Sequence, residues 1–356
     1  MQEFQYFQFK NCFEENSHVT TNLILGEIKE RPTPIFSIVI PTYKRDKLLR
    51  ESIESALNQT FKLDFEIVII DDDAHSATKN PIEEMINAFN SNKIYYYRNE
   101  KNLGQHGNWN RCFEKAKGEW VCMLHDDDKL SPNYLDDYYN LIKKIKNIGF
   151  ISCRLDFLIH NNTSKSNKPE NIKFKKRLRN IIDGLLPNYS KINSIDYLFG
   201  FNTYIVGSCI KRSLALKIGG FNSQFFPSSD YYYAVKFQNT FNMTYFLKNK
   251  NYTYRILENE SLNISTFKKF ITNDFHFTKF YIKNKNYKCS RLLFFLTYQY
   301  TIQRVNTGGE IYNIKLDSSE IFNELNINSF QNNIATRFFG SLLLKILSYY
   351  RIIFKY

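Results

Sequence analysis

The sequence predicts an α/β protein with an open, mostly parallel sheet flanked by helices. Short apolar runs rich in β-branched residues alternate with segments whose apolar residues recur at helical spacing. Each run is too short for a helix, and polar turn residues follow it. The four runs cover 36–40, 65–71, 93–99 and 120–126. This alternation is typical of βαβ units in one sheet.

Helical patterns connect these runs. Asp46 can cap the first helix, which precedes the run at 65–71. Ser131 and Pro132 form an N-cap and N1 pair that opens the last helix of this half. This last helix carries residues 134–145, and two further helices are expected at 82–89 and 107–117.

The second half has weaker signals. Residues 161–179 are polar and basic, which predicts a long surface loop. A strand is expected at 204–210, and a helix is expected to begin near Asp230. We therefore expect an N-terminal extension, a large α/β domain in two halves and a helical C-terminal appendage. Their ranges are 1–34, 35–289 (halves 35–130 and 131–289) and 290–356.

Composition limits the possible classes of protein. The formal net charge is +13 over 356 residues, but abundant Lys, Asn, Ile, Phe and Tyr also fit AT-rich codons, so charge alone selects no ligand. The six cysteines are widely spaced, which favours a reduced, cytoplasmic compartment. No secretory signal is expected at 1–34, and no apolar run approaches the roughly 20 residues that span a bilayer.

Two acidic triplets follow the second and fourth predicted strands. Parallel strands bring their carboxyl ends to one edge of the sheet, so the triplets should converge there. Adjacent buried carboxylates repel one another, and a divalent cation relieves that cost. Oxygen ligands suit Mg²⁺ or Mn²⁺. The triplets are Asp71, Asp72, Asp73 and Asp126, Asp127, Asp128.

Three other interpretations compete. The triplets could be solvated turn residues, the usual case for acidic clusters. A nucleic-acid binder would explain the charge and aromatic content, but acidic groups at the ligand edge would repel phosphates, so no nucleic acid is expected. A dinucleotide-dependent dehydrogenase needs a glycine-rich turn after the first strand, and PTYKRD at 41–46 has none.

Four ordered motifs resemble the family 2 glycosyltransferases. They are SIVIPTYKR at 37–45, IVIIDDD at 67–73, NLGQHGNWN at 102–110 and KGEWVCMLHDDDKLSP at 117–132, the DXD region. The resemblance implies the GT-A fold, an open, Rossmann-like mixed sheet flanked by helices. It also implies that residues 35–130 bind a nucleotide sugar and that 131–289 bind the acceptor.

The resemblance also assigns roles. Asp72 would face the nucleobase, while Asp126, Asp127 and Asp128 would hold the metal and the donor ribose or phosphate. The chain has His125 where many members have Asp, so the coordinating pair of carboxylates stays open; His106 and His125 receive no role. Donor-binding residues would further include Pro41, Tyr43, Arg45, Asp71, Asn102, Gly104 and Asn110.

The segment at 218–237 resembles the acceptor side of the same family. An inverting transfer needs one carboxylate to take the proton of the acceptor hydroxyl. The matching position makes Asp230 the candidate base. A UDP-sugar is the expected donor, with dTDP- or GDP-sugars as alternatives, and the expected role is in bacterial cell-envelope polysaccharide biosynthesis. A catalytically silent module that only binds carbohydrate or nucleotide sugar is the competing interpretation.

The last segment mixes bulky apolar residues with cations. Residues 334–356 either lie in a membrane interface with cations at lipid phosphates or pack on the domain or a second subunit. The acceptor is expected to be a saccharide or a lipid-linked saccharide. The expected location is the cytoplasm, or the cytoplasmic face of the inner membrane as a peripheral protein, and homo-oligomers are compatible with the sequence.

Overall fold

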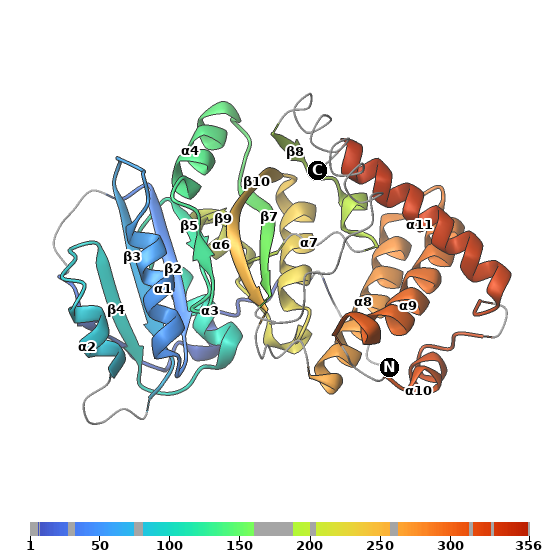
Figure 1. Ribbon diagram of the computed structural model, residues 1–356, viewed down its shortest axis with the longest axis horizontal. Helices are drawn as coiled ribbons and strands as arrows, with labels where there is room; N and C mark the ends of the chain where they lie inside the picture. Colours follow the sequence, from blue (N-terminus) through green and yellow to red (C-terminus); the bar gives the residue numbers. More distant parts are fainter. Residues whose placement is uncertain are drawn as a thin grey trace.

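The structure, a computed structural model, consists of an α/β domain and a helical region beside it (Figure 1). The domain is built on one ten-stranded sheet, ordered β1-β4-β3-β2-β5-β9-β7-β10-β6 with β8 paired to β10. The structure describes residues 6, 8–27, 33–74, 81–159, 188–199, 204–256, 263–312, 316–328 and 331–354.

Four parallel strands form the first half of the sheet, as expected. Every residue of β2 (Phe36–Thr42) and β3 (Phe65–Asp71) is buried, which explains why both strands have a continuous apolar run at their centre instead of alternating. β4 (Ile94–Asn99) pairs with β3, and β5 (Trp120–Met123) pairs with β2. The strand signals at 65–71 and 93–99 thus predict these elements to within one residue.

Antiparallel strands make the sheet mixed. β1 (Thr21–Leu25) adds an antiparallel edge to β4. β9 (Cys209–Lys211) lies antiparallel between β5 and β7 (Phe150–Ile159). β10 (Thr244–Ile256) then pairs in parallel with β7. Two short strands, β6 (Lys129–Leu130) and β8 (Tyr189–Lys191), complete the sheet against β10.

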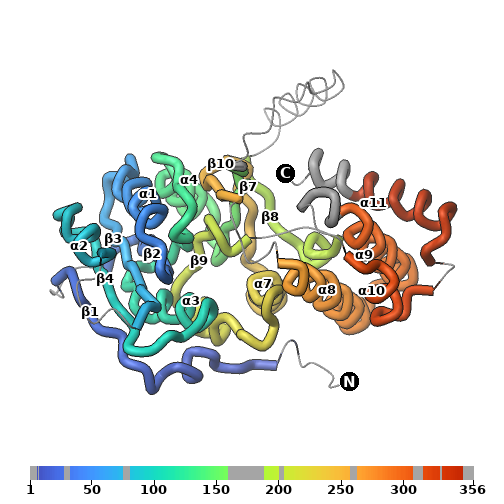
Figure 2. The backbone as a smooth tube through the Cα atoms, turned by 60° about the horizontal axis from the view of Figure 1, so that its bottom comes forward, coloured from blue at the N-terminus to red at the C-terminus, as the bar shows by residue number. Residues whose placement is uncertain are grey.

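Helices cover both faces of the sheet (Figures 1 and 2). They are α1 (Asp46–Leu57), α2 (Pro81–Asn87), α3 (Gly104–Lys115), α4 (Tyr134–Lys144), α6 (Arg212–Ile218) and α7 (Ser229–Phe241). Short 3₁₀ turns lie at Glu14–Asn16, Ser194–Tyr197 and Ser223–Phe225.

Several sequence-based boundaries were wrong in detail. Arg45 is the N-cap of α1 and Asp46 is its first residue, while Asn133 replaces Ser131 as the N-cap of α4. The strand expected at 204–210 shrinks to β9, because residues 204–208 form turns. The loop expected at 161–179 lies outside the described residues.

The N-terminal extension packs against the domain. The Cys12 amide donates to the Gly219 carbonyl at 2.8 Å. Arg111 Nη2 donates to the carbonyls of Asn16 at 2.8 Å and Val19 at 3.1 Å. A Cβ atom on Gly219, which has φ +94°, would lie 2.2 Å from the Lys10 carbonyl oxygen, so only glycine fits this contact.

Four helices form the C-terminal region: α8 (Ile264–Lys285), α9 (Ser290–Tyr312), α10 (Ser318–Glu324) and α11 (Ile334–Phe354). α8 joins two cores, because Phe277 and Tyr281 belong to the main core while Phe267 and Phe275 pack with Ile302 in a second one. The helical region therefore begins before residue 290. Within the described ranges, every helix is too short or too polar to cross a bilayer.

Candidate functional site

The site lies where the chain order of the sheet reverses. β2 is central, with β3 on one side and β5 on the other, so the connections leave it in opposite directions. In open α/β sheets, ligands bind beyond the strand ends at such a switch point, because the loops there diverge. The ends of β2, β3 and β5 lie together at this edge, and each of the latter two leads into an acidic triplet.

Thr42, the last residue of β2, links the two triplets. Its carbonyl accepts a hydrogen bond from the Asp72 amide at 3.0 Å. Its hydroxyl Oγ1 donates to Asp126 Oδ2 at 2.8 Å. The triplets therefore meet at one edge, as their positions after two strands predicted. Sequence reasoning did not single out Thr42, although it lies inside the first motif.

The first triplet is satisfied by the protein itself. Asp71 is fully buried, and its carboxylate accepts from Tyr96 Oη at 2.7 Å and from the Asp73 amide at 3.0 Å. The Arg98 guanidinium lies 3.8 Å from the same carboxylate. A buried carboxylate with these donors and a cation is a stable structural element.

Asp72 holds the N-terminus of α3. Its carboxylate accepts from Asn99 Nδ2 at 2.8 Å, the Leu103 amide at 2.8 Å and the Gly104 amide at 3.0 Å. Asn102 Nδ2 donates to the Asp72 carbonyl at 3.2 Å. Free amides and the helix dipole favour a negative charge at this position. Burial nevertheless raises the pKa of the Asp72 carboxyl.

The second triplet is crowded. The Arg45 guanidinium forms an ion pair with Asp127 and lies 3.7 Å from Asp126 Oδ1. Burial, together with the charge of neighbouring Asp127, raises the pKa of Asp126 to about 6 despite the Thr42 hydrogen bond. Adjacent carboxylates with too little compensating charge attract a cation or a proton.

Asp128 is held from the opposite end of the sheet. It is fully buried, and its carboxylate accepts from Tyr252 Oη at 2.7 Å and the Arg255 amide at 2.8 Å, both on β10. Ser52 Oγ on α1 donates to its carbonyl at 2.7 Å. Burial, with the charge of Asp127, raises the pKa of Asp128 to about 7. The sequence offers no local signal for Tyr252 or Arg255.

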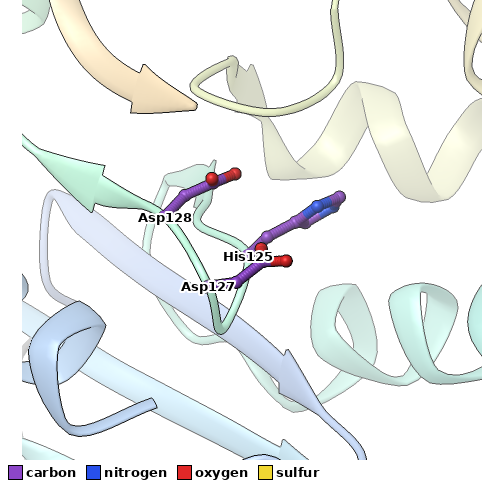
Figure 3. Close-up of side chains that lie close together, drawn as sticks. All are labelled: His125, Asp127 and Asp128. Carbon is purple, nitrogen blue, oxygen red and sulfur yellow. The ribbon is translucent and has the colours of Figure 1, made fainter. Parts of the chain in front are cut away.

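His125 completes a group that can hold a metal ion. One ligand atom each from His125, Asp127 and Asp128 lies within 4.8 Å of the others, and Figure 3 shows the three side chains projecting from one turn. His125 Nε2 is buried without a hydrogen-bond partner. Burial lowers the pKa of the imidazole, which favours the neutral form that binds metals. Asp126 lies outside this group, so its predicted ligand role stays a prediction.

The remaining predicted donor residues have different surroundings. Pro41 is buried within β2, whereas the Tyr43 side chain is 47% exposed at the strand end, with the Lys44 ammonium 5.0 Å from its ring centroid. His106 is buried on α3, and burial lowers its pKa to about 4. Trp109 lies between it and His125, with ring centroids 5.2 and 5.4 Å away. Trp109 and Trp120 are buried, as predicted.

Asn110 positions the loop before α7. Its Oδ1 accepts from the Phe221 amide at 2.7 Å, and its Nδ2 donates to the Phe221 carbonyl at 3.0 Å. A Cβ atom on Gly220, which has φ +76°, would lie 2.6 Å from Asn110 Oδ1. The glycine is therefore needed for this contact, which joins the third motif to the segment at 218–237.

Asp230 lies in the first turn of α7, as predicted. Ser228 is the N-cap, and the Asp230 carboxylate accepts from the Tyr231 amide at 2.8 Å. No cation among the described residues forms an ion pair with it. Burial, with a smaller contribution from Asp274, raises the pKa of Asp230 to about 6. Such a pKa suits a carboxylate that exchanges protons near neutral pH.

Comparisons with known proteins bear on the family and the fold. Residues 37–197 match the model of Glycosyl transferase family 2. An uncharacterised glycosyltransferase of Methanocaldococcus jannaschii is 26% identical over 280 residues, which cover 77% of this chain and 89% of the relative. The GalNAc(5)-diNAcBac-PP-undecaprenol beta-1,3-glucosyltransferase of Campylobacter jejuni is 37% identical over 98 residues, which cover 27% of this chain and 31% of that relative.

A solved structure shares the fold. The crystal structure of S. aureus TarS 1-349 in complex with UDP-GlcNAc aligns with a TM-score of 0.55 and 15% identity. The alignment covers 81% of this chain and 78% of that chain. At 15% identity this likeness concerns the fold alone.

Proposed function

Because this chain belongs to the family 2 glycosyltransferases and has the GT-A fold, we propose that it transfers one sugar, with inversion, from a nucleotide diphosphate donor to a saccharide or lipid-linked saccharide. A UDP-sugar is the proposed donor, and cell-surface polysaccharide or oligosaccharide biosynthesis is the proposed pathway. The names of the relatives support these choices: one acts on an undecaprenol-linked saccharide, and TarS was crystallised with UDP-GlcNAc.

The observation that carries the proposal is the group of His125, Asp127 and Asp128 beside the end of β2. The donor set fits Mn²⁺, which accepts both carboxylate oxygen and imidazole nitrogen, better than Mg²⁺. When bound, the cation would neutralise the charge that develops on the departing diphosphate. The orphaned His125 Nε2 and the raised carboxyl pKa values of Asp126 and Asp128 support a cation at this position.

The protein would bind the rest of the donor with residues around the same edge. Tyr43, exposed at the end of β2, would cover the nucleobase, and Arg45 would be released from Asp127 to contact phosphate once a cation is bound. Asp71 and Asp72 would shape the pocket through Tyr96 and the N-terminus of α3. Asn102 and Gly104 stay in the proposed pocket, and Asn110 would act by holding the acceptor-side loop.

Asp230 is the proposed catalytic base. Its Oδ atom would accept the proton of the acceptor hydroxyl while that oxygen attacks the anomeric carbon, and the bond to the diphosphate breaks on the opposite face. The carboxylate has the ionisable character for this step, because burial places its pKa near 6. The loop held by Asn110 and Phe221 leads directly into the helix that carries it.

Thermal stabilisation by nucleotide sugars tests the proposal. A panel of UDP-, dTDP- and GDP-sugars, each with and without Mn²⁺, should raise Tm for one donor class in the presence of metal. The same donor should then be turned over slowly to free nucleotide, and an Asp127→Ala variant should lose the turnover. Asp64→Ala, which alters an exposed carboxylate outside the site, is the matched control. Absence of both stabilisation and turnover with every donor would overturn the proposal.

A further inference from the structure

Helix α11 has its apolar residues on the outside. Its exposed apolar side chains are large, and the most exposed one reaches 85%. Spacing of four residues places most of them on one side of the helix. They are Ile334, Phe338, Phe339, Leu342 and Ile346, which we call the outer face of α11.

The opposite side of α11 packs on the protein. Gly340 and Leu344 are buried, and α11 contacts α9. A Cβ atom on Gly340 would lie 2.4 Å from Gln299 Cγ, so the glycine permits the two helices to approach closely. In Figures 1 and 2, α8 and α9 lie between the sheet domain and α11. The helix is thus anchored through the side that carries Gly340. Phe339, at the border of the outer face, contacts Phe295 on α9 with ring centroids 6.3 Å apart, and the other residues of the outer face stay exposed.

Charge distinguishes the possible occupants of this face. Residues 334–354 contain three basic residues, Arg337, Lys345 and Arg351, and no Asp or Glu. The Arg337 and Lys345 side chains are exposed beside the outer face. A second copy meeting this face by a two-fold axis would bring like charges together. An anionic lipid surface instead accepts apolar side chains below its headgroups and cations at them.

We propose that the outer face of α11 binds an anionic membrane surface, with the helix lying in the plane of the interface. Ile334, Phe338, Leu342 and Ile346 would enter the acyl boundary, and Arg337 and Lys345 would reach lipid phosphates. The length and polarity of the described helices exclude a spanning mode for them. Membrane binding by α11 does not depend on the proposed donor or metal. An experiment can therefore contradict the membrane proposal and leave the proposed function standing, or the reverse.

Vesicle binding by the full chain tests this proposal. We expect binding to vesicles of equal parts phosphatidylglycerol and phosphatidylcholine, little binding to phosphatidylcholine alone, and weaker binding at high salt. Phe338→Ser and Leu342→Ser should each weaken binding to the anionic vesicles by about tenfold, since each removes an apolar side chain that would be buried in the acyl boundary of the membrane. Leu63→Ser is the matched control, because Leu63 and Leu342 are both 46% exposed. It should bind as the unmodified chain does.

Charge reversal provides a second pair of variants. R337E/K345E should weaken binding to the anionic vesicles by at least about tenfold, because each cation near the surface contributes roughly 1 kcal/mol. K62E/K146E changes the net charge equally at two exposed lysines elsewhere and should bind normally. All variants should keep the Tm of the unmodified protein, because the substituted side chains are exposed in the fold.

Three results would overturn the proposal. Equal binding to neutral and anionic vesicles would show that Arg337 and Lys345 do not contribute to binding through their charge. Absence of vesicle binding by the unmodified chain would show that the outer face does not bind a membrane. A concentration-dependent dimer that Phe338→Ser dissociates would identify a second copy as the occupant of the outer face.

Discussion

The two acidic triplets occupy equivalent places after β3 and β5, but the protein treats their charges differently. The carboxylates of Asp71 and Asp72 are met by Tyr96, Arg98, Asn99 and the amides of α3. Asp126 and Asp128 keep raised pKa values, to about 6 and about 7, and His125 Nε2 has no partner beside them. The protein supplies hydrogen-bond donors to the carboxylates of Asp71 and Asp72, whereas we propose a cation as the partner of the second triplet. Two similar acidic motifs in one sheet can thus differ in how far the protein itself compensates their charge.

Loss of Asp127 should give the largest effect. We expect Asp127→Ala to lower kcat by at least about 10³-fold, because the cation that stabilises the departing diphosphate would lose a ligand. The free energy of unfolding should change little, since the ion pair of Asp127 with Arg45 involves a partly exposed guanidinium. Product formation at saturating Mn²⁺ and urea unfolding measure the two effects. A normal kcat in this variant would contradict the proposal that the second triplet binds a catalytic metal ion.

Substitution of Asp230 tests whether this carboxylate is the catalytic base. Asp230→Asn should lower kcat by about 10²- to 10⁴-fold with donor affinity unchanged. In the unmodified enzyme, kcat/KM should rise with pH through about 6, because only the ionised form accepts a proton and burial has raised the pKa of this acid. The asparagine variant should lose that limb of the profile. Persistence of the limb in Asp230→Asn would assign the base to another residue.

His125 should set which metal the second triplet prefers. His125→Ala should weaken Mn²⁺ binding by about tenfold, since the site would lose its nitrogen ligand. His125→Asp should instead restore activity with Mg²⁺ and lower the ratio of Mn²⁺- to Mg²⁺-supported rates. Metal titrations followed by initial rates give both values. Equal metal affinities in all three proteins would place His125 outside the coordination sphere.

Asp72 should give the smallest catalytic effect and the clearest structural one. Asp72→Ala should lower the free energy of unfolding by about 2 kcal/mol, because the amides of Leu103 and Gly104 lose their acceptor. Asp72→Asn keeps an oxygen there and should recover most of this loss. Urea unfolding of both variants beside Asp127→Ala compares the triplets directly. Unchanged stability in Asp72→Ala would mean that its carboxylate is held for a ligand instead.

Local patterns predicted the first half of the molecule well. β2 and β3 are buried throughout and each has a central apolar run, so their strand character is visible in the sequence itself. The position of Asp127 followed from β5, the fourth strand that the sequence predicted. β10 was missed because Lys248, Asn249, Lys250 and Asn251 interrupt its apolar pattern near two register shifts with β7. In an irregular strand of this kind the apolar residues do not recur at a regular spacing in the sequence, so the strand is hard to predict.

The contacts that complete the site are remote in sequence. Asp128 meets Tyr252 across 124 positions and the Arg255 amide across 127. Asn110 meets Phe221 across 111 positions, so a motif residue predicted to bind the donor positions an acceptor-side loop. No local spacing rule encodes such pairings, which arise only when β10 and α7 fold onto the first half. His125 was left without a role for a different reason: it lies within three residues of Asp127 and Asp128, but a histidine in such a loop is as often a structural hydrogen-bond partner.

The link through Thr42 has a consequence for the size of the ligand. One rigid strand residue ties the triplet beside the proposed nucleobase pocket to the triplet beside the proposed cation. The Asp72 amide and the Asp126 carboxylate both bond to this one residue, which keeps the two triplets close to each other. If the base binds beside the first triplet and the cation beside the second, the distance between the triplets sets the length of donor that the enzyme can bind. A nucleoside monophosphate sugar would then be too short to engage both ends.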